Sequence, residues 1–188
     1  MSRSAIAVAV LVIVVIVAVL IAQRVSDGPM GPLQGGGFRS GELVPGPVAD
    51  WSFVEQAKGM PEIELVAPQT SRIAGLMLND GQLYIPCDLG FMANRSWGSS
   101  TTLWFGRAMS VLKRWHIDAV EDGRVVIRLD GKRYGGQVTR VIDPDLVAAL
   151  RAQVEQMAKD FSGLESLPPA PTEEPNDIWF FHVAPRAI

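Results

Sequence analysis

The chain has 188 residues, a net charge of −3 at pH 7 and a pI of about 5.4, a balance that gives no reason to expect a nucleic-acid partner. Its single cysteine, Cys87, excludes an internal disulfide framework and a cysteine-based zinc site. The two histidines, His116 and His182, lack the spacing of metal ligands, so we expect no metal site.

An apolar segment opens the chain. Between Arg3 and Arg24 no residue is charged, and from Ala5 to Ala22 every residue is Ala, Val, Leu or Ile. As a helix with a rise of ~1.5 Å per residue, this core spans about 27 Å, close to the ~30 Å hydrocarbon thickness of a bilayer. It has no polar stripe of the kind that a buried helix usually shows. We expect residues 1–24 to form one transmembrane anchor, which contacts the lipid bilayer through Ala5-Ala22.

A cleaved secretory signal is the alternative interpretation of this segment. Such signals have an apolar region of about 7 to 15 residues followed by a small-x-small site. Here the run is longer, and the best exit, Leu20-Ile21-Ala22, lacks a small residue at its first position. Basic flanking residues tend to remain cytoplasmic. Arg3 precedes the span, whereas Arg24 is soon offset by Asp27. We therefore expect a single-pass protein of the cell membrane whose soluble domain is extracytoplasmic.

The next segment changes composition. Residues 25–48 contain seven glycines and four prolines and few large apolar residues. Such a segment buries too little surface to offset the entropy of ordering it, so we expect a flexible tether. Coil statistics place its ends about 25–30 Å apart. Residues 49–188 then form one domain of ordinary size.

Two hairpins are predicted in this domain, because Asp-Gly between apolar runs is a strong hairpin signal. Gly135-Gly136 in the last hairpin strand suggests a bulge, or a close approach by another backbone or a ligand. Alternation also predicts strands over Glu62 to Ala67, with Ile63 and Leu65 on the inner side, and over Ile178 to Ala184. The hairpin strands are Ile73 to Leu78 with Gln82 to Cys87, around Asn79-Asp80-Gly81, and Arg124 to Leu129 with Lys132 to Ile142, around Asp130-Gly131.

Helices are predicted at three places. Asp50 caps a short helix that runs through Lys58, and Asp143-Pro144 starts a helix that ends near Phe161. An apolar stripe from Trp104 to Ala119 indicates a helix of about four turns. The order of elements predicts an α+β domain, an antiparallel split β-barrel of about six strands with two main helices.

The stretch Lys113-Arg114-Trp115-His116-Ile117-Asp118-Ala119-Val120-Glu121-Asp122-Gly123-Arg124-Val125 resembles the split β-barrel flavin-binding superfamily. That superfamily includes the pyridoxamine 5′-phosphate oxidase-like proteins and the deazaflavin-dependent reductases. Gly131-Lys132-Arg133-Tyr134, the Asp143-Pro144 helix and the closing Trp179-Phe180-Phe181 strand fit the same pattern. The resemblance covers about residues 50 to 186.

This resemblance implies FMN or a deazaflavin as cofactor and a homodimer, because the family usually builds its cofactor site between two barrels. A cofactor phosphate needs cationic donors on rigid elements. Between Arg95 and Arg140 there are nine Lys or Arg against four Asp or Glu. The alternative is a solvated helix face attracted to anionic lipid headgroups. The expected cofactor-binding residues are Arg72, Arg107, Lys113, Arg114 and Trp115.

Two main functional hypotheses follow. The first is an anchored flavin- or deazaflavin-dependent oxidoreductase, in which the cofactor carries the hydride chemistry and no side chain has to be a catalytic acid or base. The second is a non-catalytic binding or scaffold domain of the cell envelope with the same fold. The extracytoplasmic orientation favours the second, and so does the long connection over residues 88–103. A third alternative is an unrelated α+β domain that shares only the order of hairpins.

Overall fold

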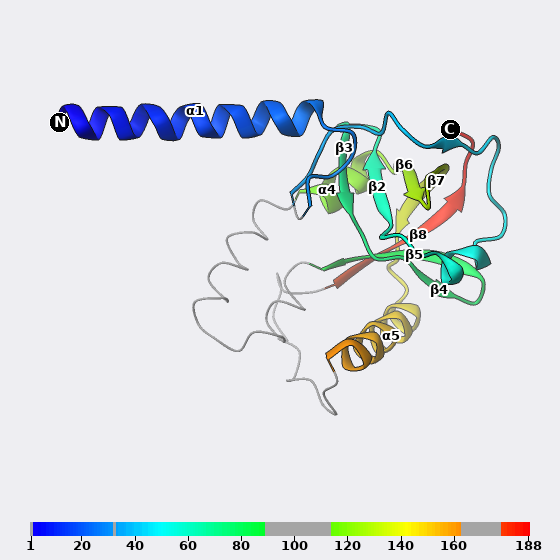
Figure 1. The fold of residues 1–188 in the computed structure, drawn as a ribbon. Coiled ribbons are helices and arrows are strands. Elements are labelled where there is room, and N and C mark those ends of the chain that lie inside the picture. The colour runs from blue at the N-terminus through cyan, green and yellow to red at the C-terminus, as the bar shows by residue number, and fades with distance from the viewer. Residues whose placement is uncertain (1, 32, 89–113, 163–177) are drawn as a thin grey trace.

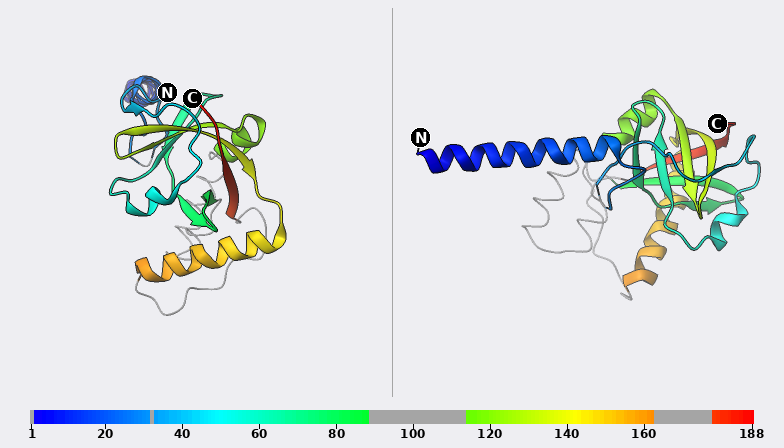
Figure 2. Two further views of the ribbon diagram at one scale, coloured as in Figure 1. Left: turned by 90° about the vertical axis from the view of Figure 1, so that its right-hand side faces the viewer. Right: turned by 45° about the horizontal axis from the view of Figure 1, so that its top comes forward.

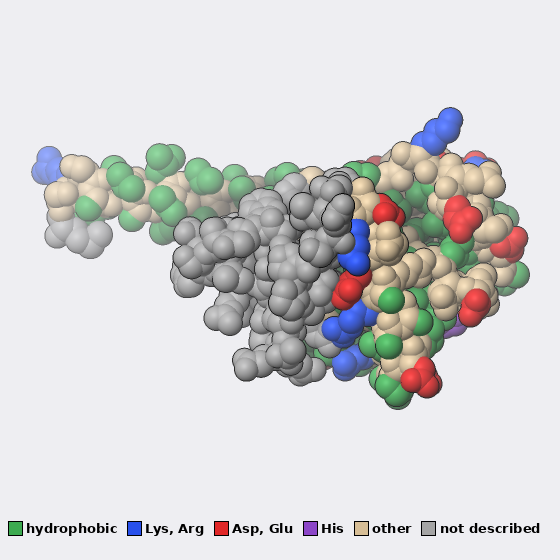
Figure 3. Space-filling model, turned by 90° about the horizontal axis from the view of Figure 1, so that it is seen from below, with side chains coloured by type: hydrophobic (Ala, Val, Ile, Leu, Met, Phe, Trp, Pro, Cys, Tyr) green, Lys and Arg blue, Asp and Glu red, His purple; other side chains and the backbone are tan. Residues whose placement is uncertain are grey.

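The computed structural model describes residues 2–31, 33–88, 114–162 and 178–188. A long helix, α1 (Arg3–Val25), projects from one side of a curled sheet (Figure 1). The side chain of Ser2 caps α1 by accepting a hydrogen bond from the Ala5 N–H. None of the residues of α1 is buried, and apolar side chains line the visible side of the helix (Figure 3). By length and composition α1 could cross a membrane, a test that a signal sequence also passes.

The sheet is antiparallel apart from one short strand, and it curls into a barrel-like shape (Figures 1 and 2). The α+β class, the antiparallel sheet and the apolar N-terminal helix are confirmed, and the described residues form a sheet of eight strands where about six were predicted. Their order is β3-β2-β6-β7-β8-β5-β4, and β1 lies parallel to the start of β7. The strands are β1 (Glu42–Leu43), β2 (Glu62–Leu65), β3 (Thr70–Ile73), β4 (Met77–Asn79), β5 (Gln82–Asp88), β6 (Arg124–Leu129), β7 (Lys132–Arg140) and β8 (Ile178–Pro185).

Both predicted hairpins form. Asp80 and Gly81 join β4 to β5 with φ values of 50° and 74°, and Asp130 and Gly131 join β6 to β7 with 47° and 77°. Two consecutive positive φ angles define the turn whose twist matches that of the flanking strands, which explains why Asp-Gly is favoured there.

Alternation along the strands produces the core inside the barrel. Directly paired residues of neighbouring strands project to the same face, so Ile63 lies beside Ile127, and Ile85 beside Phe181. All four are at most 1% exposed. Helix α4 (Trp115–Glu121) adds Trp115 and Ala119 to this interior, as their helical spacing predicts. The rest of the helix that was expected from Trp104 lies outside the described residues.

Helix α5 (Pro144–Ser162) covers the opposite face of strands β4, β5 and β8 (Figures 1 and 2). Its start is as predicted: an Asp143 carboxylate oxygen accepts the N–H groups of Asp145 and Leu146, and Pro144 occupies the first turn. Leu150 is fully buried against Met77, Tyr84, Ile178 and Phe180. Met157, two turns further along α5, is 51% exposed.

Gly135 and Gly136 lie in a regular ladder between β6 and β7, so there is no bulge at this position. The alternative interpretation, a close approach by another part of the backbone, is correct. A Cβ atom on Gly135 would lie 2.5 Å from the carbonyl oxygen of Arg186. The glycines therefore allow the C-terminal end of the chain to pack against β7.

The short helix after Asp50 also differs in extent. It is a 3₁₀ helix, η1 (Ser52–Gln56), and it ends before Lys58. The N-cap residue is Trp51 and not the predicted Asp50, and no side chain caps the helix. The carboxylate of Asp50 accepts hydrogen bonds from the N–H and the hydroxyl of Ser52 just before the helix.

The segment that was expected to be a flexible tether makes hydrogen bonds with the barrel. Its residues 26–31 and 33–44, which we call the strap, lie on the outer face of the barrel. Gly35 exchanges two backbone hydrogen bonds with Ser71 of β3, and the N–H groups of Glu42 and Val44 donate to carbonyls of Gly131 and Arg133. Composition alone misses these bonds because their partners are distant in the sequence.

Truncating a core side chain tests this packing. Ile127→Ala is expected to lower the free energy of unfolding by about 2–5 kcal/mol, because Ile127 is fully buried in the interior. Ile142→Ala is the matched control, since Ile142 is 83% exposed and its truncation should change stability by less than about 0.5 kcal/mol. Guanidinium unfolding of the full chain in detergent micelles, followed by tryptophan fluorescence, measures both. Equal midpoints for the two variants would contradict the assignment of the core.

Candidate functional site

Arg72 lies on the edge strand β3 and points into the barrel. It is paired directly with Ile63 of β2, whose side chain is in the interior. The Cζ atom of its guanidinium lies 5.4 Å from the centre of the Trp115 ring. The structure thus brings together two of the predicted site residues, one from a strand and one from the start of α4.

Burial lowers the pKa of Arg72 to about 10, and the nearby groups Cys87 and Asp118 oppose that shift. Arg72 is therefore still charged at neutral pH. Among the residues that the structure describes, none forms a hydrogen bond or an ion pair with this guanidinium. A half-buried cation of this kind retains its capacity to bind an anion.

A second cation–aromatic contact lies near the first. The Cζ atom of Arg140, at the end of β7, is 3.4 Å from the centre of the Trp179 ring. The Trp179 ring packs edge-on against His116. Phe181, two residues further along β8 and on the same face, packs against Trp115. Arg140 was not predicted as a site residue. The sequence pattern could have indicated it: Arg140 lies two residues beyond Val138, which is buried, and alternation along a strand places both side chains on the same face.

The remaining predicted site residues are Arg107, Lys113 and Arg114. Arg114 immediately precedes α4 and its side chain is exposed. Arg107 and Lys113 lie outside the described residues. The cluster that the structure supports consists of Arg72 and Trp115, with Arg140 and Trp179 beside them.

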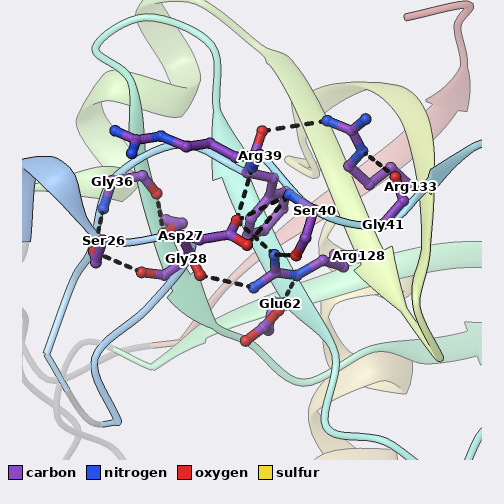
Figure 4. A network of polar contacts seen from close by, with 12 residues as sticks. Ser26, Asp27, Gly28, Gly36, Arg39, Ser40, Gly41, Glu62, Arg128 and Arg133 are labelled. Carbon is purple, nitrogen blue, oxygen red and sulfur yellow. Dashed lines mark hydrogen bonds and ion pairs between the residues drawn. The ribbon is translucent and has the colours of Figure 1, made fainter.

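A separate polar network joins the strap to the outer face of the barrel (Figure 4). Arg128 of β6 bridges two carboxylates, with its Nη1 atom 2.9 Å from Asp27 and its Nε atom bonded to Glu62. Its guanidinium also stacks on the ring of Phe38 at 4.3 Å. Arg133, the partner of Arg128 on β7, donates to backbone carbonyls of the strap. This network connects the end of α1 to the barrel.

Asp27 is held ionised within this network. The hydroxyl of Ser40 and the N–H of Arg39, together with Arg128, hold the pKa of Asp27 far below its usual range. A depressed pKa means that the carboxylate stabilises the fold above the ordinary aspartate pKa of 3.8 and loses that contribution only in strong acid. The network is therefore intact at neutral pH.

The strap also covers a carboxylate on the outer face of β2. Glu64 of β2 is 6% exposed, and its oxygens accept the N–H of Phe38 at 2.6 Å and the side-chain amide of Gln69 at 2.9 Å. Next to it on β3, the fully buried Ser71 hydroxyl donates to the carbonyl of Gly36. These bonds satisfy buried polar groups and cover the free edge of β3.

Comparisons with protein-family models, with curated proteins and with solved structures find no match to this chain. The fold alone defines the class of protein: an α+β domain with a curled antiparallel sheet, preceded by an apolar helix that is long enough to cross a membrane.

The strap network makes a prediction for proteolysis. Arg128→Gln removes both ion pairs, and charge-assisted hydrogen bonds are worth about 1.5–3 kcal/mol each, so trypsin should cleave after the exposed Arg39 about tenfold faster or more. The control is Arg124→Gln on the same strand, whose exposed pair with Asp122 lies outside the network. Mass spectrometry of timed digests measures the rate at this bond. An unchanged rate in Arg128→Gln would show that the strap does not depend on Arg128.

Proposed function

We propose that this protein is a membrane-anchored member of the split β-barrel class that binds a phosphorylated flavin, either FMN or a deazaflavin, at the end of the barrel beside α4. The observation that carries the proposal is the inward-facing guanidinium of Arg72, which lies against the ring of Trp115 and forms no ion pair with any described carboxylate, although the charge of Asp118 is near enough to raise its pKa. The resemblance in sequence and the barrel-like antiparallel sheet support it.

The residues present fit such a group at the end of the barrel and not inside it. Phe181, Ile127 and their neighbours fill the interior at close to zero exposure, so a ring system has no space there. At the barrel end, Arg72 provides planar donors for a phosphate, and Trp115 and Trp179 provide aromatic surface. A bound flavin supplies the redox chemistry, and the protein supplies binding and orientation. A second copy of the chain would complete the site, as the resemblance implies.

Ligand titration tests the proposal. The full chain in detergent micelles should bind FMN or a deazaflavin, and Arg72→Gln should weaken binding by at least about tenfold through loss of a charge-assisted contact. Arg72→Lys should restore only part of the affinity, because an ammonium lacks the planar fork. Arg124→Gln, which changes an exposed arginine, is the control. Quenching of the flavin fluorescence gives the dissociation constants. Absence of binding by the unmodified protein would refute the proposal.

A second candidate function is a non-catalytic binding or scaffold domain of the cell envelope. The observation that favours it is the packing of the interior by the protein's own side chains, together with a strap that fixes the barrel to α1. Such a domain needs a fixed position at the membrane and no cofactor. Tight flavin binding with turnover of an electron acceptor would exclude it.

We also propose that α1 spans the cell membrane with its N-terminus in the cytoplasm. The exposed C-terminal residue, Ile188, is a suitable point for reporter fusions. Alkaline phosphatase fused after Ile188 should be active, and a fluorescent protein that matures only in the cytoplasm should be dark, because flanking positive charge favours a cytoplasmic N-terminus. The reverse pattern would place the barrel in the cytoplasm.

A further inference from the structure

A groove separates the last turns of α1 from the near edge of the barrel. Its volume is about 500 Å³. One wall is apolar and comes from Val17, Leu20 and Ile21 of α1. The other wall is mostly polar and comes from the strap, the turn between β2 and β3 and the start of β3, including Gln34, Gln69 and Thr70.

The position of this groove in the bilayer follows from the length of α1. Val17 lies seven residues before Arg24, about 10 Å along the helix axis. In a helix that crosses ~30 Å of hydrocarbon from Arg3, the wall formed by Val17, Leu20 and Ile21 lies ~21 to ~27 Å from Arg3, in the outer part of the acyl region, and Arg24 lies at the headgroups.

An exposed apolar turn lies beside the groove. Met30 and Leu33 exchange two backbone hydrogen bonds, of 3.1 and 3.2 Å, which bring the strap into a tight turn. Their side chains are 37% and 42% exposed. In both Figure 1 and Figure 2 the strap runs back beside the end of α1 before it reaches the barrel. Apolar side chains at the end of a membrane span are typical of segments that insert into the interface.

We propose that the edge of the barrel beside α1 is a membrane-docking surface: the groove holds an acyl chain of a phospholipid from the adjacent leaflet, and Met30 and Leu33 insert beside it. The apolar wall matches the acyl chain, and the polar wall and Arg24 match the phosphate headgroup. The strap network keeps the barrel in this position, because Asp27, three residues after Arg24, is bonded to Arg128. This inference rests on the proposal that α1 spans a bilayer.

Site-specific fluorescence tests the surface. In a Cys87→Ala background, single cysteines are introduced as Leu33→Cys in the turn, Thr70→Cys in the groove and Met60→Cys as a control, and each is labelled with a polarity-sensitive fluorophore. Met60 is apolar and 70% exposed, and it precedes the end of β2 that lies away from α1. The full-length proteins are reconstituted in vesicles of phosphatidylcholine and phosphatidylglycerol, with and without lipids that carry a spin label high on the acyl chain.

Labels at residues 33 and 70 should emit at shorter wavelength than the label at residue 60, and spin-labelled lipid should quench them about threefold more. Resistance to extraction by alkaline carbonate reports separately on α1. Equal quenching at all three positions in a carbonate-resistant protein would overturn the docking surface and leave the span standing. Extraction by carbonate would overturn the span, and the docking surface with it.

Discussion

The contact on which the arrangement of this molecule depends is the bridge from Arg128 to Asp27 and Glu62. Arg128 stands in a row across the outer face of the sheet, between Glu62 on β2 and Arg133 on β7. Its side chain is only 13% exposed and is covered by the ring of Phe38, so its ion pairs are screened less than those of a surface arginine. Because Asp27 follows α1 by two residues, this bridge determines where the helix meets the barrel.

The glycines of the strap are required by the same arrangement. A Cβ atom on Gly35 would lie 1.8 Å from the carbonyl oxygen of Gly28, and one on Gly36 would lie 2.6 Å from that of Ser26. Gly28 itself has a φ of +88°, which other residues rarely adopt. A glycine-rich composition therefore has two physical meanings. It lowers the tendency of a free chain to order, and it allows a chain to pack closely where a partner supplies hydrogen bonds.

Features that depend on near neighbours in the chain could be predicted from the sequence. The Asp80-Gly81 turn and the start of α5 at Asp143-Pro144 are examples, because backbone angle and capping are decided within a few residues. The docking of the strap depends on pairs such as Phe38 with Glu64 and Asp27 with Arg128, which are 26 and 101 residues apart. Nothing in the local pattern around Glu64 distinguishes a carboxylate under the strap from one in water.

The candidate site divides in the same way. Arg72 and Trp115 were predicted as members of one site, and the structure places them in contact; Arg140 above Trp179 was missed because that pair depends on the register of β7 with β8.

Comparison of Arg72 with Arg128 shows why Arg72 is the better candidate for ligand binding. Both are partly buried, but Arg128 is neutralised by two carboxylates, so its charge is already used in the fold. Among the described residues, Arg72 lies against an aromatic face, which stabilises a cation without neutralising it, and Asp118 raises its pKa without forming an ion pair. A charge held in that way favours the binding of an anion, and this is the physical basis for proposing the end of the barrel, and not the strap network, as the candidate site.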